Sequence, residues 1–442
     1  MGKKQEPSER PDFASRLRTT AVRGVNAVLQ RTSFVLELNA DLEIGNHSAA
    51  GALAFLLSAV PALLLSFGLA GLLLQLFPSG TKEFQTWVSH FLGPVNLPDA
   101  TPKIFGHGFF ALGTLAAVLG LLYSSRLFFS TIRKTLKVIW GSPETTPRWT
   151  DTVAGYAVEV LSLVVLVSVL ALSEAARTLV FANQDELDPG IFEFMTVLVS
   201  VVPFLILWVF FSVTLRLFPL EKPGRLQTMA YSLVAVTLFS ISAEILRVAI
   251  NTDQYEMLYG VIANLVVVLL NVSVFFTLYF LTAAFLFVEQ HLDALLFGRY
   301  YRHWGHDKPP FPDNVLFKNP KRLRLLYGKT FEAGAVMFQV GDQGSTAFFL
   351  EAGEVEIVLA AEAEKGKGAI LDVLAPGQIF GETASILGEP RNATARAKTA
   401  VVVLELPAEV FGFYLRTDRF ASKRIIGTLA HRLKRANSRP AP

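Results

Sequence analysis

The residues best suited to chemistry lie near the end of the chain, in FGETASILGEPRNATARA, which runs from Phe380 to Ala397. Glu382 and Arg391 stand nine residues apart in a segment otherwise built from small and polar side chains. Small residues let backbone N–H groups approach a ligand, and such groups at the start of a helix favour an anion. An arginine adds a charged donor that matches a phosphate, and a carboxylate accepts hydrogen bonds from hydroxyl groups. The segment predicts a pocket for a ligand with a phosphate and a sugar hydroxyl.

The surrounding sequence predicts the elements that must position this pocket. From Phe331 onward, short β-like runs alternate with glycine-containing breaks, and the clearest runs lie at 335–340, 346–351 and 354–360. About eight such strands fit into roughly 75 residues, and two helices follow them. KNPKRLRLLYGKT, just before the first strand, is typical of a short basic helix. The pattern predicts an antiparallel β-roll of jelly-roll type with flanking helices.

A cyclic nucleotide carries both groups that the pocket is suited to hold. The segment resembles the phosphate-binding cassette of cyclic nucleotide-binding domains, such as those of protein kinase A regulatory subunits. GDQGSTAFFLEAGEVEI is similar to the glycine and aromatic run of the same family, and the resemblance covers roughly residues 325–435. It implies that Glu382, with the backbone of Gly381, holds the ribose 2′-hydroxyl. It also implies that Arg391 pairs with the cyclic phosphate.

The resemblance implies further contacts, which are Thr383, Ala384, Asn392 and Ala393 in the pocket, Leu374 and Ile379 in its wall, and Phe420, Ile425, Ile426 or Leu429 over the base. In that family the position of Asn392 is often Ala where adenine is preferred and Thr where guanine is preferred. Asparagine is compatible with either base, so cAMP is the preferred expectation and cGMP is also compatible.

The composition excludes several other kinds of site. The chain has no cysteine, which excludes disulfides, thiolate metal sites and a cysteine nucleophile. The seven histidines are scattered and no acid–base or metal cluster is recognisable, so no metal and no enzymatic activity are expected. The nearest candidate cluster, His303 with His306 and Asp307, lies in a short Pro-rich segment and is expected to be solvated.

The chain before this domain is too apolar for an ordinary soluble protein. Of the 442 residues, 52% are hydrophobic, and the mean hydropathy is +0.44. Apolar runs long enough to cross about 30 Å of hydrocarbon recur six times, with few charges and no alternating polar face. The six expected spans are 49–77, 107–128, 153–173, 191–215, 228–247 and 258–288. An α-helical polytopic membrane bundle in a lipid bilayer is therefore predicted.

Lysine and arginine are distributed unequally between the expected loops. They are frequent in the N-terminal tail and in the second and fourth loops, whereas the third loop, ANQDELDPG, has none. The positive-inside rule therefore places the tail and the even-numbered loops in the cytoplasm. Six spans then return the C-terminus to the same side, so both termini are expected to be cytoplasmic.

Several apolar segments resemble the YihY/BrkB (ribonuclease BN-like) family of bacterial inner-membrane proteins. These are ALAFLLSAVPALLLSFGLAGLL, with Ser58 three residues before Pro61, LLYSSRLFFSTIRKTLKVIWG, LRLFPLEKP and LYGVIANLVVVLL. The resemblance covers roughly residues 30–295, although LLNVSVFF replaces a Trp-containing segment in the last helix. It implies six helices and a multi-pass protein of the bacterial inner (plasma) membrane, without implying a substrate.

Some features of the membrane part leave alternatives open. Residues 13–36 predict a helix that lies on the inner leaflet or packs on the bundle. Acids and arginines near the outer boundary form a gate or interfacial ion pairs, and asparagines in the last span are expected to form hydrogen bonds between helices. The outer pairs are Glu174 with Arg177 and Glu244 with Arg247, and the asparagines are Asn264 and Asn271. The single acid Glu159 is expected about two turns into its helix from the cytoplasmic side.

The sequence therefore predicts four parts, which are a basic tail at 1–46, a membrane domain at 47–296, a linker at 297–317 and a cyclic nucleotide-binding domain at 318–442. The expected function is regulation of the membrane domain, in transport or permeation, by the nucleotide. The alternative is a membrane-anchored receptor or scaffold that controls a partner protein without transport. Nucleic acid is not an expected partner, since the net charge is only +3 and the chain after the last strand is too short for a helix-turn-helix. A homo-oligomer is compatible with the sequence.

Overall fold

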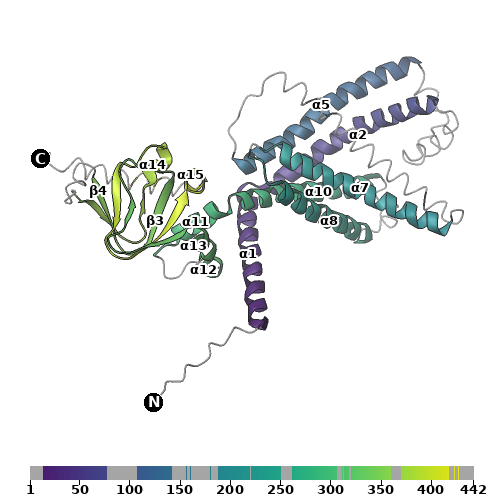
Figure 1. Ribbon diagram of the computed structural model, residues 1–442. Helices are drawn as coiled ribbons and strands as arrows, with labels where there is room; N and C mark the ends of the chain where they lie inside the picture. Colours follow the sequence, from purple (N-terminus) through teal and green to yellow (C-terminus); the bar gives the residue numbers. More distant parts are fainter. Residues whose placement is uncertain are drawn as a thin grey trace. The chain divides into compact units, whose positions relative to one another are not determined.

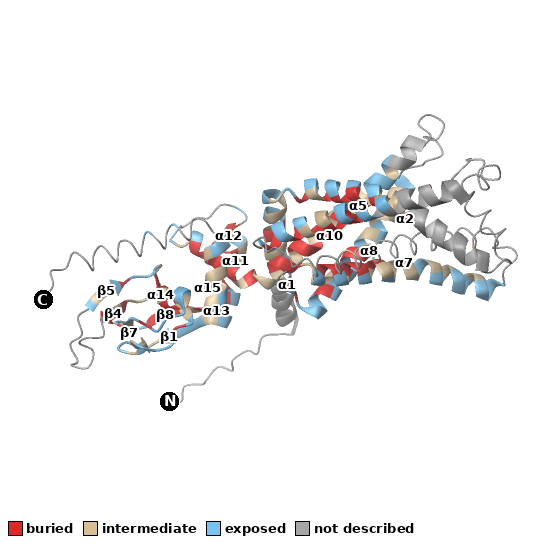
Figure 2. Ribbon diagram, turned by 90° about the horizontal axis from the view of Figure 1, so that it is seen from above, coloured by how far each residue is buried: buried red, intermediate tan, exposed pale blue. Residues whose placement is uncertain are grey.

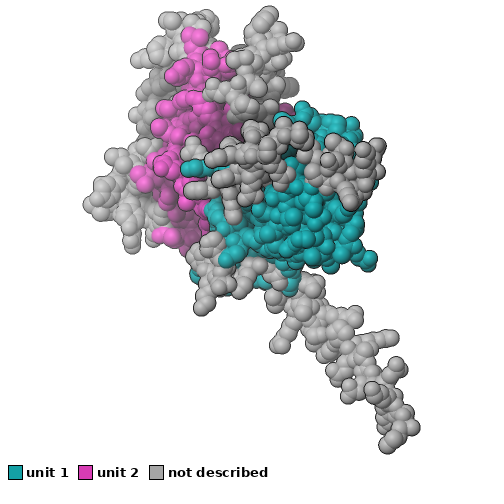
Figure 3. Space-filling view, turned by 90° about the vertical axis from the view of Figure 1, so that its left-hand side faces the viewer, with its two compact units in different colours: residues 1–34, 288–442 teal, residues 35–287 magenta. Residues whose placement is uncertain are grey.

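The computed structural model describes residues 13–76, 107–141, 188–219, 221–249, 261–305, 313–317, 320–359 and 370–417, and the single positions 156, 160, 180, 311, 423 and 427. The chain divides into two compact units, coloured separately in Figure 3. One unit is formed by residues 1–34 and 288–442, and the other by residues 35–287.

Long apolar helices build the second unit (Figure 1). The helices of this part of the chain are α1 (Phe13–Asp41), α2 (Ile44–Leu76), α5 (His107–Trp140), α7 (Pro189–Leu217), α8 (Arg225–Ala249) and α10 (Val261–Gln290). Among the described residues, three segments are long and apolar enough to cross a membrane: 189–217, 225–246 and 266–290, with hydropathies of 2.6, 1.7 and 2.2. They coincide with the last three expected spans. The expected span at 153–173 lies outside the described residues except for positions 156 and 160.

Small and hydroxyl-bearing residues bring these helices together. The Ser58 hydroxyl on α2 lies 2.7 Å from the Ser124 carbonyl oxygen on α5. Between α10 and α7, the Tyr279 hydroxyl donates to the Thr214 hydroxyl over 2.9 Å. Such contacts replace the hydrophobic driving force that apolar helices lack in lipid. Phe276 on α10 is fully buried and packs against Gly51 of α2, whose missing side chain makes room for the ring.

The structure describes only some of the polar residues in the expected spans. The Asn271 amide donates to the Val267 carbonyl of its own helix over 3.1 Å, and its expected hydrogen bond to another helix stays a prediction. Glu244 is exposed. Glu159, Glu174 and Arg177, and the side chains of Asn264 and Arg247, lie outside what the structure describes.

The C-terminal part is a roll of two antiparallel sheets with flanking helices. Its strands are β1 (Gly328–Phe331), β2 (Val336–Phe338), β3 (Thr346–Ala352), β4 (Val355–Leu359), β5 (Ile370–Leu374), β6 (Ile379–Phe380), β7 (Ala393–Ala397) and β8 (Val401–Pro407). One sheet has the order β1-β8-β3-β6 and the other β2-β7-β4-β5. Helix α13 (Lys321–Tyr327) precedes the roll, α14 (Glu382–Leu387) joins β6 to β7, and α15 (Ala408–Thr417) follows β8. The expected antiparallel β domain after a basic helix is confirmed.

The segment predicted as a linker at 297–317 begins inside a helix. Helix α11 (Leu292–Arg302) follows α10 after one residue, and the four-residue α12 (Asp313–Leu316) lies further on. Phe297 and Tyr301 of α11 pack against Phe349 of β3 and Tyr414 of α15, with ring centroids 5.1–6.1 Å apart. These aromatic contacts fix α11 to the roll, so the first residues of the predicted linker belong to the domain core.

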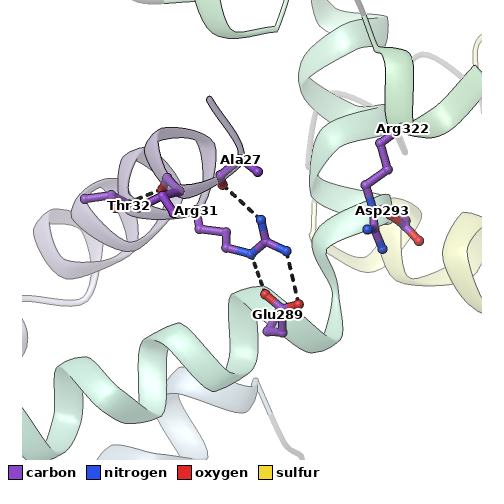
Figure 4. A network of polar contacts seen from close by, with 7 residues as sticks. Ala27, Arg31, Thr32, Glu289, Asp293 and Arg322 are labelled. Carbon is purple, nitrogen blue, oxygen red and sulfur yellow. Dashed lines mark hydrogen bonds and ion pairs between the residues drawn. The ribbon is translucent and has the colours of Figure 1, made fainter. Parts of the chain in front are cut away.

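The end of α1, up to Phe34, packs within the unit formed by residues 1–34 and 288–442 (Figure 4). The Arg31 guanidinium donates to both carboxylate oxygens of Glu289, at the end of α10, over 2.5 and 3.2 Å. Gln30 donates to the Leu316 carbonyl, and the Phe34 and Phe317 rings pack at a tilt of 50° with their centroids 5.1 Å apart. This end of the helix therefore packs within its own compact unit, and the choice between the inner leaflet and the bundle stays a prediction. The side chains of 13–24 are outside the described part of the chain.

Candidate functional site

Arg391, two residues before β7, is a buried cation with only neutral hydrogen-bond partners. Its side chain is 5% exposed. One terminal nitrogen donates to the Gly381 carbonyl over 2.6 Å, and the other to the carbonyl and hydroxyl oxygens of Thr346 over 2.7 and 3.1 Å. The guanidinium also lies over the rings of Phe338 and Phe348, at 4.3 and 5.6 Å. No carboxylate of the described residues forms an ion pair with it.

The two sequence motifs meet around this arginine. Gln343 forms an isolated bridge with Pro390, and the Arg391 backbone N–H donates to the Asp342 carbonyl over 2.9 Å. A Cβ added at Gly344 would lie 2.6 Å from Arg391 Nε and 2.8 Å from the Ala384 side chain. The glycine-rich loop, α14 and the guanidinium therefore meet at Gly344, where only glycine fits without a clash.

Glu382 is placed on the same turn as the Arg391 contact. Its side chain is 3% exposed at the first position of α14, directly after Gly381. Gly381 has a φ of 69°, in the left-handed region that favours glycine. The turn thus directs the Gly381 carbonyl to the guanidinium and starts the helix that carries the acid.

The other predicted residues lie at different depths. Ala384 is buried, Thr383 and Ala393 are half-buried, and Asn392 is exposed. The predicted wall residues Leu374 and Ile379 are buried, and Leu374 belongs to the hydrophobic core between the sheets. The four candidates for the base cap, at 420, 425, 426 and 429, lie outside the described residues.

Three residues that hold Arg391 were not assigned a role from the sequence. They are Thr346, Phe338 and Phe348. Strand alternation gives one signal, because Thr346 and Phe348 share a face of β3. Their contact with Arg391 depends on the pairing of distant strands.

The electrostatics favour an anion in this pocket. Burial lowers the pKa of the Arg391 guanidinium, while the more distant carboxylates of Glu405, Asp342 and Glu382 act in the opposite direction. An arginine nevertheless remains protonated in a protein. A buried positive charge without an ion-pair partner is stabilised when an anion joins it.

Metal-binding clusters are not seen in the described part of the chain. No group of three or more His, Asp or Glu side chains there is placed to hold an ion. His303, expected to be solvated, is instead part-buried and lies 2.7 Å from Asp313, which also pairs with Arg299. His306 and Asp307 lie outside the described residues.

The roll and the apolar helices define a class of protein, a helical membrane protein that carries a cyclic nucleotide-binding domain. A family model for the cyclic nucleotide-binding domain matches residues 328–418. The model "Virulence factor BrkB" matches residues 40–296, which is more than half of the chain. The chain belongs to this BrkB family. The two models describe a membrane protein family and a binding domain.

Each half of the chain has its own relatives. Over 89 residues it is 38% identical to a cyclic nucleotide-gated potassium channel from Mesorhizobium japonicum, covering 20% of this chain and 22% of the channel. Over 167 residues it is 26% identical to a UPF0761 membrane protein from Aggregatibacter aphrophilus, covering 38% of this chain and 58% of that protein. The chain therefore spans about a fifth of the first relative and little more than half of the second.

One solved structure resembles the chain over about a quarter of its length. The cAMP-bound form of the EAL enzyme Bd1971 is 27% identical, with a TM-score of 0.21, and the match covers 25% of this chain and 29% of that one. The family matches, rather than this partial likeness, identify the domain.

Proposed function

We propose that the roll binds a cyclic nucleotide, with cAMP preferred over cGMP, and that the bound nucleotide regulates the membrane domain in transport or permeation. The observation that carries this proposal is Arg391, a buried cation that donates to carbonyl and hydroxyl oxygens and forms no ion pair among the described residues. A cyclic phosphate supplies the missing opposite charge and a geometry that suits a guanidinium.

The roles within the pocket follow from this placement. Arg391 holds the cyclic phosphate, and Glu382 accepts a hydrogen bond from the ribose 2′-hydroxyl with help from the Gly381 backbone. Thr383, Ala384, Asn392 and Ala393 line the rest of the site. The support is the shared turn at Gly381, which contacts Arg391 and leads directly into Glu382.

The proposed architecture is a six-span protein of a bacterial inner membrane with both termini in the cytoplasm. Its parts are the tail at 1–46, the membrane domain at 47–296, the binding domain at 318–442, and the connection at 297–317, whose first residues pack on the binding domain as part of α11. The family match at 40–296 and the three apolar segments support the membrane part. A cytoplasmic roll meets the compartment where cyclic nucleotides are made. Neither catalysis nor nucleic-acid binding is part of the proposal.

Strand β3 offers a route from the pocket to the helices. Thr346 and Phe348 contact Arg391 on one face of the strand. Phe349 points to the opposite face, where its ring lies 5.7 Å from Phe297 and 4.9 Å from Trp304. A guanidinium that turns from Thr346 to a phosphate therefore acts on the strand that holds α11. Helix α11 in turn follows α10 after a single residue.

The likeness to the potassium channel supports only part of this function. It covers 20% of the chain, so it bears on the binding of a nucleotide and not on potassium. A receptor that controls a partner protein uses the same pocket, and the two functions differ in whether the membrane helices respond to the nucleotide.

Titration of the purified full-length chain with cAMP and with cGMP tests the pocket. Arg391→Ala should weaken cAMP binding about tenfold or more, because charge-assisted hydrogen bonds contribute about 1.5–3 kcal/mol. Arg396→Ala is the matched control, since Arg396 is an exposed arginine on β7, five residues after Arg391. Equal affinities of the parent and Arg391→Ala would contradict the assignment of the pocket.

A further inference from the structure

A groove of about 420 Å³ lies along α7 and the start of α8, far in sequence from the nucleotide pocket. One end has an apolar wall, formed by Trp208, Val209 and Val213 of α7 and Met229 of α8. The wall is open to the surroundings, since Val209 is 52%, Val213 53% and Met229 43% exposed. Both helices have the length and hydropathy of membrane spans, so this wall is suited to hydrocarbon.

Three cations line the other end of the same groove. Arg216 lies in the last turn of α7, Lys222 in the connection, and Arg225 at the first position of α8. No carboxylate is part of the lining, and none of this cation triad forms an ion pair with a described residue. Glu221 precedes Lys222 in sequence but is not part of the lining.

The spacing of the two ends matches the dimensions of a lipid. Trp208 and Arg216 are eight residues apart on α7, which corresponds to about 12 Å at 1.5 Å per residue. One leaflet contributes about half of the 30 Å hydrocarbon thickness. The groove thus presents apolar surface at acyl-chain depth and positive charge near the depth of a headgroup.

Simpler reasons explain only part of this arrangement. A cation in the last turn of a helix is favoured by the helix dipole, which accounts for Arg216. The same dipole disfavours Arg225, which stands at the N-terminal end of α8. The positive-inside rule accounts for basic residues in this loop but not for the convergence of all three on one apolar groove.

We propose that this groove binds an anionic glycerophospholipid, with an acyl chain against the apolar wall and the phosphate among the cation triad. A soluble anion would leave the apolar wall unused, and a zwitterionic lipid would leave the positive charge of the triad uncompensated. The site is independent of the nucleotide pocket and belongs to the membrane helices alone.

Trp208 provides a direct reporter of the occupant. Its indole N–H donates to the Met229 carbonyl over 2.9 Å, which holds the ring in the wall. The full-length chain is reconstituted in vesicles of phosphatidylcholine and phosphatidylglycerol. In one preparation the phosphatidylglycerol is brominated, and in the other an equal mole fraction of the phosphatidylcholine is brominated. The difference between the parent and Trp208→Phe isolates the Trp208 emission. At equal mole fractions, brominated phosphatidylglycerol should quench it more strongly.

Neutral variants assign that preference to the triad. Arg225→Gln should weaken the preference for phosphatidylglycerol about fivefold, because the attraction of one cation to anionic lipid contributes about 1 kcal/mol. The triple variant Arg216→Gln, Lys222→Gln, Arg225→Gln should abolish it. The matched control replaces three exposed cations of α5, Arg126, Lys134 and Lys137, by Gln and should keep the preference. An unchanged melting midpoint and cAMP isotherm establish that each variant is folded.

Four results would overturn the proposal. The first is equal quenching of Trp208 by the two brominated lipids, and the second is a preference that survives in the folded single and triple variants. The third is loss of the preference when sn-glycerol 3-phosphate is added, because the site would then take a soluble anion. The fourth is emission that neither lipid quenches, because another protein segment would then cover the groove.

Discussion

The pocket at the residue scale depends on how little space surrounds the guanidinium of Arg391. A Cβ at Gly381 would lie 2.6 Å from Arg391 Nη1, whereas a Cβ at Gly388 would meet nothing within 4 Å. Both glycines have a φ near 68–69°, so alanine is strained equally at either position. The two ends of α14 therefore separate backbone strain from pocket geometry.

Alanine at these two glycines should affect stability and binding differently. Gly388→Ala should cost about 1 kcal/mol of stability through backbone strain alone and leave cAMP affinity unchanged. Gly381→Ala carries the same strain and also displaces Arg391, so it should weaken cAMP binding about tenfold. Denaturant unfolding and cAMP titration of the full-length variants measure the two effects. Equal loss of affinity in both variants would contradict the close fit around Arg391.

The sequence predicts the charged pair of this pocket but not its support. Glu382 and Arg391 are recognisable because their types and spacing suit a sugar and a phosphate. Thr346, Phe338 and Phe348 are ordinary strand residues in the sequence. Their contact with Arg391 follows from which strands pair, which local patterns do not specify. The base cap expected at 420–429 lies outside the described residues and stays a prediction.

Helix α11 is the element that joins the roll to the membrane helices along the chain. The Tyr327 hydroxyl at the end of α13 donates to Asp293 of α11 over 2.8 Å, and Arg322 pairs with the same carboxylate. Burial, followed by the hydrogen bond to Asp293, raises the pKa of Tyr327 to about 12. The docking of α13 on α11 therefore depends on a protonated phenol.

Alkaline pH should weaken this docking in a defined window. A folded-state pKa of about 12, above the ordinary value of 10, gives stability that is complete below pH 10 and is lost as the pH rises towards 12. Tyr327→Phe has no phenol to ionise, so its stability should fall less over that window. Melting midpoints of Tyr327→Phe and of the parent between pH 8 and about 12 measure this. Parallel curves for Tyr327→Phe and the parent would refute it.

The ion pair between α1 and the end of α10 should be energetically coupled. Arg31 and Glu289 are 21% and 18% exposed, and their contact is bidentate. A double-mutant cycle of Arg31→Ala and Glu289→Ala should give a coupling energy of about 1 kcal/mol. The exposed pair Lys398 and Glu354, at 45% and 46%, should give a clearly smaller coupling energy, because solvent screens it. A coupling energy no larger than that of the control pair would contradict the docking of α1.

The elements were predictable to different degrees. Alternating short runs and glycine breaks predicted the antiparallel domain, and apolar runs predicted the helices at 191–215, 228–247 and 258–288. Helix α11 was read in part as linker, because LDALLFGRYYR mixes charges and aromatics and precedes a Pro-rich stretch. Its aromatic residues are buried by Phe349 and Tyr414, which follow much later in the chain. A helix stabilised by such tertiary contacts has a weak local signal.

Burial colouring shows how each part of the molecule uses its apolar residues (Figure 2). Buried residues in the roll lie between its two sheets, whereas α7 keeps many apolar residues exposed along its length. Such exposure suits a lipid environment and would be unstable in water. The two units therefore suit two different solvents, and the chain passes from one to the other within α1 and within α10.

If the nucleotide regulates the membrane helices, cAMP binding and the transmission of its effect to those helices should be separable by substitution. In the reconstituted full-length chain, cAMP should change amide hydrogen exchange in α11 and in the last turns of α10. Arg391→Ala should require about tenfold more cAMP or higher for the same change, because only binding is weakened. Phe349→Leu should bind cAMP with nearly parental affinity and lose the change, because Phe349 contacts α11 and not Arg391. Phe349→Ala should do so more completely but at a cost of about 3–5 kcal/mol in stability.

A matched substitution in the sheet that does not contain β3 is the control for this experiment. Val373→Ala replaces an exposed residue of β5, away from both Arg391 and α11, and should preserve binding and transmission. If Phe349→Leu transmits the nucleotide signal as fully as Val373→Ala, β3 is not the route to the helices. If cAMP binds the parent and alters no exchange in α10 or α11, the membrane domain is an anchor for a nucleotide receptor rather than its regulated part. Both alternatives are decided in the same reconstituted chain, because the binding isotherm and the exchange profile are measured on one sample.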